Sequence, residues 1–519
     1  MGSLNVRFPN QLRYFTLRYL FRVKTPKDLI RYISRKYKTK KLLVQEGNYR
    51  TFAQINENIN RFCNTSNLLG LSKGDCVAVF LKNCFEFIEI RLACYKTGLI
   101  FCALTDDFSN EEIVRQLKNT KCRLLVHDHR ISPESVKDLK KTITGLFTFL
   151  LTCEPLHTGS YHSFLEQVQT RNPDYEIDNK EISAIGFTSG TSGHRKAVVW
   201  SHQAWISSFY NFLLTSPKSS TKKRVFLHTM PLSTVGSLSI LPGLASGGLN
   251  VLLREFDVKK VAEAIDRYKV TNLVISPSFM IDLWDFYLNS GNQFDFSALR
   301  VVSLGSAPIA QSKLKALIET FGPVFQQGYG MAEVLAPLCG YRYETSRLEK
   351  NGYGTLGKPF NSKSIKLKSL DGSGLNRIIV QSKTCCEGYW NHGKIDSSSI
   401  ENGWFSTTDL GSFDSKGHFF VHDRISNILR KKGKVIIARD LEEVIHKCPG
   451  IKDAAAYVSD DNLRVWVSPL KANRLTEQQV RAFCEQHCPQ HWIPDSIKIV
   501  TELPYNSSGK VLKYKMLNS

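Results

Sequence analysis

The chain has 519 residues, of which 42% are hydrophobic and 22% charged, and its formal net charge is +22. This length exceeds what one hydrophobic core supports and predicts about three domains or subdomains of an ordinary globular protein. No apolar stretch reaches the ~18 uncharged residues that a membrane-spanning helix needs. The charge favours anionic partners, but no nucleic-acid recognition motif accompanies it, so we expect no nucleic-acid binding.

Much of the positive charge lies at the start of the chain. Residues 1–41 contain twelve Lys or Arg and a single acidic residue, Asp28. A membrane-surface helix that gives peripheral membrane contact, or an Arg-rich organelle-targeting segment, would have this composition. A solvated basic arm packed on the first domain would have it too. Charges interrupt every apolar run here, which argues against a secretory signal.

The cysteines indicate a reducing compartment. The chain has 13 of them, without paired spacing and without His partners at zinc-site distances, which predicts reduced thiols in an intracellular protein. We therefore expect a cytoplasmic protein, with membrane association or organelle targeting through the basic N-terminus as the alternatives.

From about residue 42 to residue 180, strand-like and helical patterns alternate. The sequence predicts strands at Cys76–Leu81, Ile100–Leu104 and Leu124–His127, and helices at Glu86–Thr97 and Asn110–Lys118. Such alternation is typical of βαβ units in a parallel sheet.

The same alternation of strand-like and helical patterns occurs again from residue 224 to residue 328. Strands are predicted at Val225–Leu227, Leu249–Leu253, Leu273–Ile275 and Val301–Leu304, with helices that include Val258–Tyr268 and Ser312–Thr320. The two regions together predict two doubly wound halves, with a ligand crevice at the carboxyl ends of their strands. Residues 354–414 change to short strands separated by Gly, Asn and Asp, which predicts a small β-rich subdomain. After Arg424 the chain has the pattern of a compact αβ unit.

A loop of small and hydroxyl residues follows one strand-like run. It consists of Thr188, Ser189, Gly190, Thr191, Ser192 and Gly193, and Lys196 follows shortly after it. Small residues let backbone N–H groups approach phosphate oxygens, and a Lys neutralises charge. The spacing is not that of a Walker loop, because Ala197 follows the Lys. Taken alone, the segment is a weak signal, and a flexible surface turn is the alternative.

This segment resembles the phosphate loop of the adenylate-forming superfamily, which contains acyl-CoA synthetases, aryl-acid AMP ligases and luciferases. That loop is typically TSGTTGxPKG; here Arg195 stands in place of the Pro and Ala197 in place of the last Gly. Further motifs of the superfamily follow in the same order, from roughly residue 50 to the end of the chain.

The segment 328–333, Gly-Tyr-Gly-Met-Ala-Glu, resembles the family's YGxTE motif. The resemblance implies that Tyr329 stacks on adenine and that Glu333 coordinates Mg²⁺; an aromatic face and a hard carboxylate oxygen suit these roles. Ala332 replaces a Thr that touches phosphate, as in many aryl-acid ligases. The remaining residues implied to contact the nucleotide are Gly305, Ser306, Ala307, Gly330 and Met331.

Two later motifs are implied to hold the ribose. The segment 404–411 resembles GW(F/Y)xTGDxG, so Asp409 would accept hydrogen bonds from the ribose hydroxyls, with Thr408 in place of a Gly. Arg424 matches the ribose-contacting Arg at the junction of two domains. The hinge position two residues later, usually Lys or Asp, is Ser426, and a small polar residue still permits rotation.

The last two motifs concern the two half-reactions of the family. Gly433 resembles the loop that faces the pantetheine tunnel during thioester formation. The segment 503–510 resembles LPxTxxGK, which makes Lys510 the catalytic lysine of adenylation. The point charge of a Lys can hold a carboxylate and the α-phosphate together.

The resemblance implies an α/β fold with a large N-terminal adenylation domain, residues 1–423, formed by two doubly wound subdomains and the small β-rich one. A small mobile α+β domain, residues 424–519, would carry Lys510 and turn between half-reactions. The implied activity is ATP-dependent activation of a carboxylic acid to an acyl-AMP, with Lys510, Glu333 and Thr188 as catalytic groups. Transfer to a thiol follows, most simply that of CoA. The implied cofactors are ATP, Mg²⁺ and CoA, or a carrier-protein phosphopantetheine in its place.

The acid itself is less defined. By resemblance, its pocket contains His228, Thr234, Gly305 and Val334, and a medium-size aliphatic or aryl acid fits; His228 could equally be the end of a core strand. Two other functions stay open. One is a ligase that loads an acyl or aryl carrier protein. The other is a degenerate, noncatalytic nucleotide-binding protein, which the departures at Arg195, Ala332, Thr408 and Ser426 favour.

Overall fold

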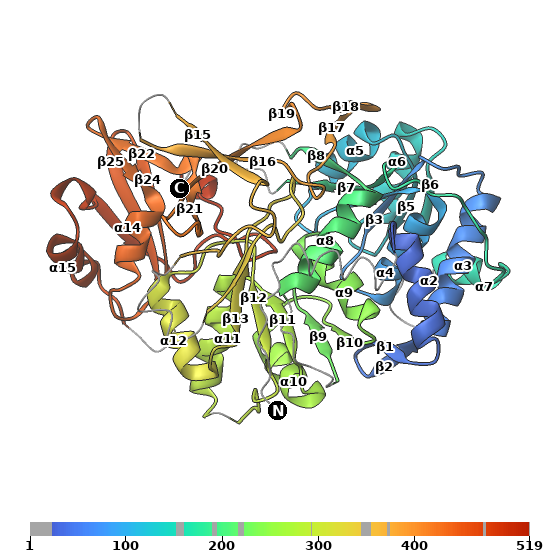
Figure 1. The fold of residues 1–519 in the computed structure, drawn as a ribbon, viewed down its shortest axis with the longest axis horizontal. Helices are drawn as coiled ribbons and strands as arrows, with labels where there is room; N and C mark the ends of the chain where they lie inside the picture. The colour runs from blue at the N-terminus through green and yellow to red at the C-terminus, as the bar shows by residue number, and fades with distance from the viewer. Residues whose placement is uncertain are drawn as a thin grey trace.

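The computed structural model describes residues 23–151, 160–188, 195–215, 223–291, 293–343, 354–370, 374–470 and 474–517. Two eight-stranded sheets make up most of the molecule (Figure 1). The first sheet lies at one end, the second occupies the middle, and the C-terminal unit (residues 428–517, orange to red) lies at the other end.

The first sheet has the strand order β18-β17-β8-β7-β4-β3-β5-β6. Its core is parallel, and β8 and β17 add antiparallel pairs at one side. The alternation predicted between residues 76 and 127 is confirmed. The bounds are β3 (Cys76–Phe80), β4 (Ile100–Ala103), β5 (Cys122–His127), β6 (Phe147–Leu150), β7 (Ile182–Phe187), β8 (Ala197–Ser201), β17 (Gly388–Asn391) and β18 (Lys394–Asp396).

The helices of this half begin at ordinary caps; for example, the Thr51 side chain accepts from the backbone N–H of Gln54 at the start of α3. One helix is exceptional, because every residue of α4 is buried. Its charged side chains therefore need partners inside the protein. The helices are α3 (Phe52–Leu68), α4 (Phe85–Thr97), α5 (Asn110–Asn119), α6 (Pro133–Thr142), α7 (Ser160–Glu166) and α8 (His202–Thr215).

The second sheet has the order β14-β13-β12-β11-β9-β10-β1-β2, so the first two strands of the chain complete it. The strands predicted between residues 225 and 304 are confirmed. Its strands are β1 (Lys41–Gln45), β2 (Asn48–Thr51), β9 (Val225–His228), β10 (Leu249–Leu252), β11 (Asn272–Ile275), β12 (Val301–Leu304), β13 (Phe325–Gly328) and β14 (Gly340–Arg342). Its helical segments are the 3₁₀ turn η1 (Val235–Ser239), α9 (Ile240–Ala245), α10 (Val258–Tyr268), α11 (Pro277–Asn289) and α12 (Gln311–Phe321).

The helix α2 (Pro26–Tyr37) begins at a capping box on Thr25 and buries Leu29, Ile30 and Ile33. Its basic residues Arg31 and Arg35 are exposed. The described part of the basic N-terminus is thus packed on the protein, whereas residues 1–22 lie outside the described residues.

The predicted β-rich segment contributes to two sheets. Most of its strands form a five-stranded sheet, but β17 and β18 join the first eight-stranded sheet instead. This segment therefore ties the first sheet to the C-terminal unit. The five strands are β15 (Ile365–Ser369), β16 (Asn376–Val380), β19 (Ile400–Glu401), β20 (Trp404–Phe413) and β21 (Phe419–Arg424).

The C-terminal unit follows a short 3₁₀ turn, η2 (Ile425–Asn427), and has its own hydrophobic core. That core includes Ile436, Leu441, Val465 and Val480. Its elements are β22 (Ile428–Lys431), β23 (Lys434–Ile437), α14 (Ala438–Ile445), β24 (Ile451–Ser459), β25 (Asn462–Pro469), α15 (Glu477–His487), the 3₁₀ turn η3 (Gln490–Trp492), β26 (Ser496–Ile499) and α16 (Tyr514–Leu517).

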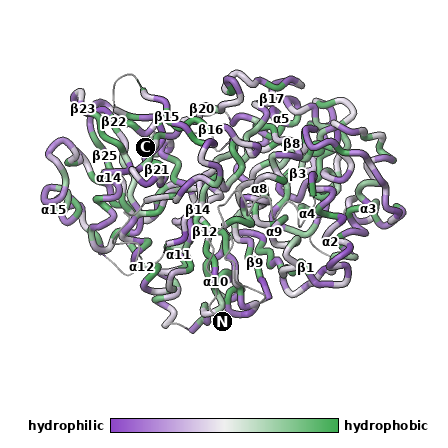
Figure 2. The backbone as a smooth tube through the Cα atoms, in the orientation of Figure 1, coloured by the Kyte–Doolittle hydropathy of each residue, from purple (hydrophilic) through white to green (hydrophobic). Residues whose placement is uncertain are grey.

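Hydrophobic residues concentrate on the central strands, and hydrophilic ones on the outer helices and loops (Figure 2). The architecture is the predicted α/β class, with mixed sheets in the large part and a smaller unit at the C-terminus. The twelve cysteines that the structure describes are all free thiols, as expected. Among the described residues, no helix combines the length and the apolar character that crossing a membrane requires.

Candidate active site

The predicted phosphate loop connects β7 to β8. The Thr188 N–H donates to the carbonyl of Lys196 at 3.0 Å, and the Lys196 N–H donates to Thr188 Oγ1 at 3.1 Å. These two residues therefore close the base of the loop by extending the antiparallel pairing of the strands. The loop residues proper, from Ser189 to Gly193, lie outside the described residues.

Arg195, which stands where the superfamily has a Pro, makes contacts that a Pro could not. Its guanidinium donates to Asp107 Oδ2 at 2.6 Å and to Thr105 Oγ1 at 3.0 Å, and it lies 5.0 Å from the centre of the Phe108 ring. Arg195 thus attaches the end of the phosphate loop to the segment that follows β4.

Glu333 is held by a residue that the sequence did not single out. The Tyr389 hydroxyl donates to Glu333 Oε1 at 2.9 Å. The Tyr389 ring also lies 4.7 Å from the ammonium of Lys196. Strand pairing explains this meeting, because β17 places Tyr389 opposite Val198 of β8. Only an aromatic residue in a short strand marks this position in the sequence, and the pairing of β17 with β8 could not be read from it.

The segment 328–334 turns tightly between the two sheets. A Cβ on Gly330 would overlap with Ala336, so only glycine fits there. The Ala332 carbonyl accepts from the indole N–H of Trp200 at 2.9 Å, which ties this segment to β8. Val334 is fully buried and pairs with Met331.

Tyr329 and Arg424 converge on Asp409. Asp409 lies opposite Arg424 in the β20–β21 pair, with 3.7 Å between Asp409 Oδ1 and the Arg Nε. The Tyr329 hydroxyl donates to Asp409 Oδ2 at 2.9 Å. Burial raises the pKa of Asp409, and Arg424 opposes that rise by favouring the ionised form. Thr408, which replaces a Gly of the motif, points to solvent from an extended strand, so its side chain disturbs nothing.

The segment 305–307 follows β12 and lies beside β13. The Gly305 N–H donates to the carbonyl of Ile275 at 3.1 Å, and the Gln327 side chain donates to the carbonyl of Ala307 at 3.1 Å. Ser306 has a φ of 71°, a left-handed conformation that is uncommon outside glycine. The carboxyl ends of the two strands thus bring this segment next to residues 328–333, as the crevice argument predicted.

The loop that carries Lys510 reaches out of the C-terminal unit onto the second sheet. The Ser278 hydroxyl donates to the carbonyl of Gly509 at 2.7 Å, and the hydroxyls of Ser508 and Thr234 lie 3.3 Å apart. Gly509 has a φ of 72°, and a Cβ there would overlap with Ser276. The glycine is therefore required by both its backbone conformation and its close contact.

Lys510 lies within the electrostatic reach of the other predicted groups. Burial and the Arg424 charge lower the pKa of its ammonium to about 8, while the carboxylates of Asp409 and Glu333 act in the opposite direction. Lys510 therefore lies in the combined field of Arg424, Asp409 and Glu333, and Tyr389 links Glu333 to Lys196 at the base of the phosphate loop.

Two predicted residues lie elsewhere. Gly433 is at the exposed tip of the β22–β23 hairpin, where a Cβ would meet no described atom within 4 Å. His228 is buried at the end of β9. Its Nε2 lies 3.0 Å from Asn250 Oδ1 and its Nδ1 lies 3.2 Å from Ser239 Oγ. Burial lowers the pKa of His228 to about 4, so it is neutral near pH 7. Its surroundings are those of a core histidine.

Polar contacts hold the C-terminal unit against α11 and α12. The Gln311 N–H donates to Glu443 Oε2 at 3.0 Å, and the Ser312 hydroxyl donates to the carbonyl of His446 at 3.2 Å. Lys452 forms an ion pair with Asp282 at 2.5 Å. No motif in the sequence marks these contacts, because they depend on how the two parts dock.

Comparison with known proteins identifies the family. The profile of AMP-binding enzymes matches residues 31–390, and that of the AMP-binding enzyme C-terminal domain matches residues 440–510. The chain belongs to the AMP-binding enzyme family. It is an AMP-forming acid–thiol ligase, as the ordered motifs predicted, and the family uses ATP and CoA.

Relatives and solved structures agree with this assignment. The 2-succinylbenzoate–CoA ligase of Bacillus cytotoxicus is 27% identical over 476 residues, which cover 90% of this chain and 93% of that protein. The anthranilate–CoA ligase AuaEII in complex with anthranoyl-AMP has the same fold, with a TM-score of 0.85 and 20% identity over 95% of this chain and 96% of that one. The O-succinylbenzoate–CoA synthetase of Bacillus subtilis in complex with AMP gives a TM-score of 0.79 and 21% identity over 94% of this chain and 97% of that one.

Proposed function

We propose that this ligase joins a carboxylic acid to CoA in two steps that share one crevice. The carboxylate oxygen first attacks the α-phosphorus of ATP, and pyrophosphate leaves to give an acyl-AMP. The thiol then attacks the acyl carbon, AMP leaves, and a thioester forms. The observation that carries the proposal is the docking of the Lys510 loop on Ser278 and Thr234, together with the contacts of Asp409 with Tyr329 and Arg424.

Adenylation requires positive charge and positioning rather than a protein nucleophile. Lys510 would hold the two reacting anions together, and its docked loop supports that placement. Thr188, Lys196 and the loop 189–193 would take the phosphates. Asp409 would hold the ribose, with Tyr329 and residues 305–307 and 330–332 around the base and the α-phosphate.

Glu333 fits a Mg²⁺ site. Mg²⁺ is commonly held by one or two carboxylates together with substrate phosphates, so a single half-buried carboxylate suffices. The ion would neutralise charge on the phosphates as pyrophosphate leaves. Tyr389 orients this carboxylate through its hydrogen bond to Oε1, so Glu333 would be held in place to bind the ion.

The second step would need a different arrangement of the chain. With residues 1–423 as the adenylation domain and 424–519 as the mobile one, a turn about residues 424–426 would withdraw Lys510 and bring the Gly433 hairpin to the crevice. Arg430, Lys432 and Lys434 are exposed around that hairpin. Their charge supports an acceptor with phosphate groups, such as CoA.

An aryl acid is the proposed substrate, with Thr234, Gly305 and Val334 as lining residues. The acids named for the relatives, 2-succinylbenzoate and anthranilate, are both aryl acids, which supports this class. Two of the sequence departures that favoured a noncatalytic protein do not disturb the site. Arg195 forms an ion pair of its own, and Thr408 points to solvent.

Acid-dependent ATP–pyrophosphate exchange tests the first step, and thioester formation with CoA tests the second. We expect exchange with aryl acids, and thioester with CoA. Thioester on a holo carrier protein but not on CoA would overturn the choice of acceptor. Absence of exchange with every acid of an aliphatic and aryl panel would overturn the proposed function itself.

A further inference from the structure

The side chain of Asn83 joins the two eight-stranded sheets. Asn83 follows β3 of the first sheet, whereas its partners follow β9 and β10 of the second. Its Nδ2 donates to the carbonyls of Met230 and Leu253, each at 3.0 Å, and its Oδ1 accepts from the Leu232 N–H at 2.8 Å. Both hydrogens of the amide are thus used to hold the second sheet's loops against the first sheet.

Asn83 is itself fixed in place. Its backbone carbonyl accepts from Nε2 of Gln45, the last residue of β1, at 2.8 Å. Its side chain lies in the interior, where the residue is only 3% exposed. Because a buried amide that loses its partners is costly, these bonds define one position of residues 230–232 relative to Asn83.

A short chain of hydroxyl groups connects this segment to the Lys510 loop. The Thr234 hydroxyl donates to the Pro231 carbonyl at 2.9 Å, and the Ser508 hydroxyl lies 3.3 Å from Thr234 Oγ1. Because Thr234 has one hydroxyl hydrogen and Pro231 takes it, Ser508 is the donor in the second contact. Pro231 stands between the two residues whose backbones Asn83 holds, so Asn83 sets the position of the carbonyl at which this chain ends.

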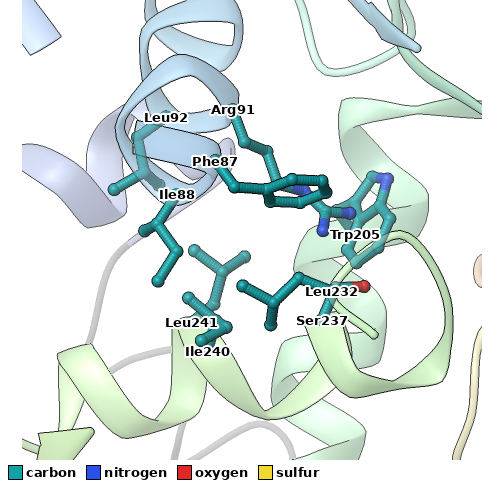
Figure 3. A pocket seen from close by; sticks show the side chains of 9 residues that line it. All are labelled: Phe87, Ile88, Arg91, Leu92, Trp205, Leu232, Ser237, Ile240 and Leu241. Atoms are coloured by element: carbon teal, nitrogen blue, oxygen red, sulfur yellow. The ribbon is translucent and has the colours of Figure 1, made fainter. Parts of the chain in front are cut away.

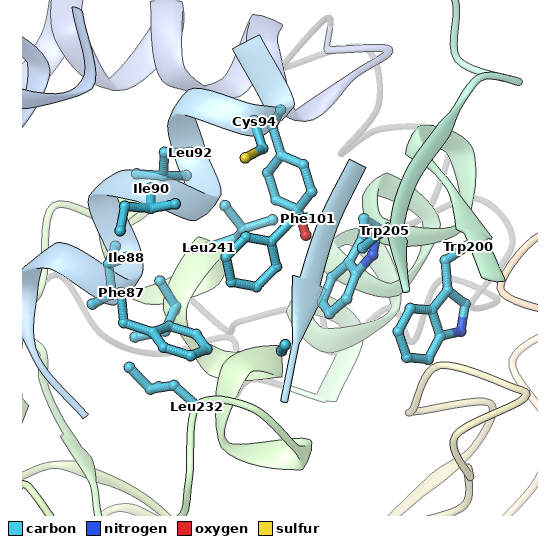
Figure 4. Close-up of a cluster of buried hydrophobic side chains, with 14 of the residues drawn as sticks. Phe87, Ile88, Ile90, Leu92, Cys94, Phe101, Trp200, Trp205, Leu232 and Leu241 are labelled. Carbon is cyan, nitrogen blue, oxygen red and sulfur yellow. The ribbon is translucent and has the colours of Figure 1, made fainter. Parts of the chain in front are cut away.

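Apolar packing of the same segment is incomplete. The Leu232 side chain lies beside Phe87 in the hydrophobic cluster (Figure 4). Leu232 and Ser237 are separated from Phe87 and Ile88 of α4 by a small cavity with room for about one water molecule (Figure 3). Side chains that line such a cavity lose part of their contacts. The position of the segment therefore depends on the hydrogen bonds of Asn83 as well as on apolar contacts.

We propose that Asn83 is a positioning residue for adenylation. By fixing residues 230–232, it holds the Thr234 hydroxyl at the place where Ser508 binds it, and so keeps the Lys510 loop docked during the first step. Asn83 acts through this segment and not through a contact with the substrates. The inference rests on the proposed function, because it takes Lys510 to act in adenylation. It assigns a role to a residue that the sequence motifs did not single out.

The test measures whether Asn83 and Ser508 act through the same chain of hydrogen bonds. In the full-length enzyme, Asn83→Ala should slow acid-dependent pyrophosphate exchange by about tenfold, and Ser508→Ala, which removes the donor at the other end, should slow it by a similar factor. The double variant should lose no more than the larger single loss, because the second change removes a link that the first has already broken. Thioester formation from supplied acyl-AMP should change by less than about twofold in each variant.

Asn60→Ala is the matched control. Asn60 is another buried asparagine, whose amide donates to the Thr170 carbonyl at 3.1 Å and accepts from Lys96. Its loss should lower the melting temperature but leave pyrophosphate exchange within about twofold of the wild type. Asn83→Asp keeps the size of the side chain and the acceptor for Leu232 but removes the donors, so it replaces Asn83→Ala if that variant fails to fold.

Amide hydrogen exchange of residues 503–510 gives a readout that requires no activity. It should be faster in Asn83→Ala and Ser508→Ala than in the wild type, and unchanged in Asn60→Ala. Three results would each overturn the inference: unchanged amide exchange in Asn83→Ala, losses of pyrophosphate exchange that multiply to about 100-fold in the double variant, or an equal loss in Asn60→Ala. Absence of pyrophosphate exchange with every acid would instead count against the proposed function, and the amide exchange would still test whether Asn83 keeps the loop docked.

Discussion

Two glycine-containing loops of the C-terminal unit differ in their surroundings. Gly509 and Gly433 both have left-handed backbones, with φ of 72° and 76°. The Gly509 loop is docked against Ser276 and Ser278 at the start of α11, whereas the Gly433 hairpin is exposed. The Lys510 loop, proposed to act in adenylation, is thus docked in this structure, whereas the loop proposed for the thioester step is exposed.

The proposed rotation of the C-terminal unit predicts the character of the contact between the two parts. A unit that presented first one loop and then the other could not bury a large apolar interface in either position. The contacts with α11 and α12 include an ion pair and single hydrogen bonds, such as Lys452–Asp282 and Gln311–Glu443. Polar interfaces of this kind are typical of parts that move relative to each other.

The largest expected effect separates the two loops directly. Lys510→Ala removes the cation that holds the reacting anions, so pyrophosphate exchange should fall by about 100- to 1,000-fold. ATP binding, measured by titration, should remain, and thioester formation from supplied acyl-AMP should be nearly unchanged. Lys513→Ala is the control, because this neighbouring Lys bonds to Glu442 and lies outside the crevice. Equal losses in both half-reactions would contradict the assignment of the Lys510 loop to adenylation and of the Gly433 loop to thioester formation.

The pH dependence tests the electrostatic surroundings of the docked loop. Burial lowers the pKa of Lys510 to about 8 in the free enzyme. Because adenylation uses the protonated form, kcat/KM for exchange should fall by about tenfold per pH unit above pH 8. Lys510→Arg should remove this decline, since a guanidinium stays charged.

The lowered pKa of Lys510 also makes the stability of the fold depend on pH. Between pH 8 and the ordinary lysine pKa of 10.5, the unfolded chain binds more protons at this site than the folded one. The contribution of Lys510 to the free energy of unfolding should therefore rise with pH in that window. Denaturant titrations of wild type and Lys510→Met at pH 8 and pH 10 measure this contribution, and the opposite sign would show that Lys510 is not buried as described.

Substitution of Tyr389 should have a smaller effect, on the Mg²⁺ concentration that exchange requires. Tyr389→Phe removes the hydrogen bond to Glu333 but keeps the ring beside Lys196. A hydrogen bond to a charged group is worth a factor of about ten in affinity or more, so the Mg²⁺ concentration for half-maximal exchange should rise by about tenfold. Titration of the nucleotide-bound enzyme with Mn²⁺, followed by EPR, should show the same loss of affinity. Tyr175→Phe, which removes an exposed hydroxyl bonded to Asn67, is the control.

The sequence predicted most strands and helices because each has a local signal. Cys76–Phe80 is uniformly apolar and buried, and the cap of α3 contains the Thr and Gln of a capping box. The ordered motifs also singled out Tyr329, Asp409 and Arg424, which the structure brings into contact. Several motif residues, such as Thr188, Glu333 and Lys510, lie in loops outside the strands, whereas Asp409 lies within β20. Loops commonly carry the functional residues of a fold, which is why a sequence motif can mark them.

Features that depend on non-local pairing could not be predicted. β17 lies in the chain between β16 and β19 of the five-stranded sheet, yet it pairs with β8, and this non-local pairing helps to bring Tyr389 to Glu333. Likewise, Arg91 appears in the sequence as one of four charges in a helix that has no separate polar face. Its burial follows from α4 being enclosed on all sides, which no pattern within the helix reveals.

The smallest expected effect concerns the docking contact. Lys452→Met breaks the ion pair with Asp282, which is largely shielded from solvent, so the adenylating arrangement should lose a factor of about three to ten in population. Exchange should slow by that factor or less, while thioester formation from supplied acyl-AMP should stay level or rise. Lys141→Met, which breaks the exposed pair with Asp138, should change neither rate. If Lys452→Met instead slowed both steps equally, the contact would support the fold of the C-terminal unit rather than the balance between its two loops.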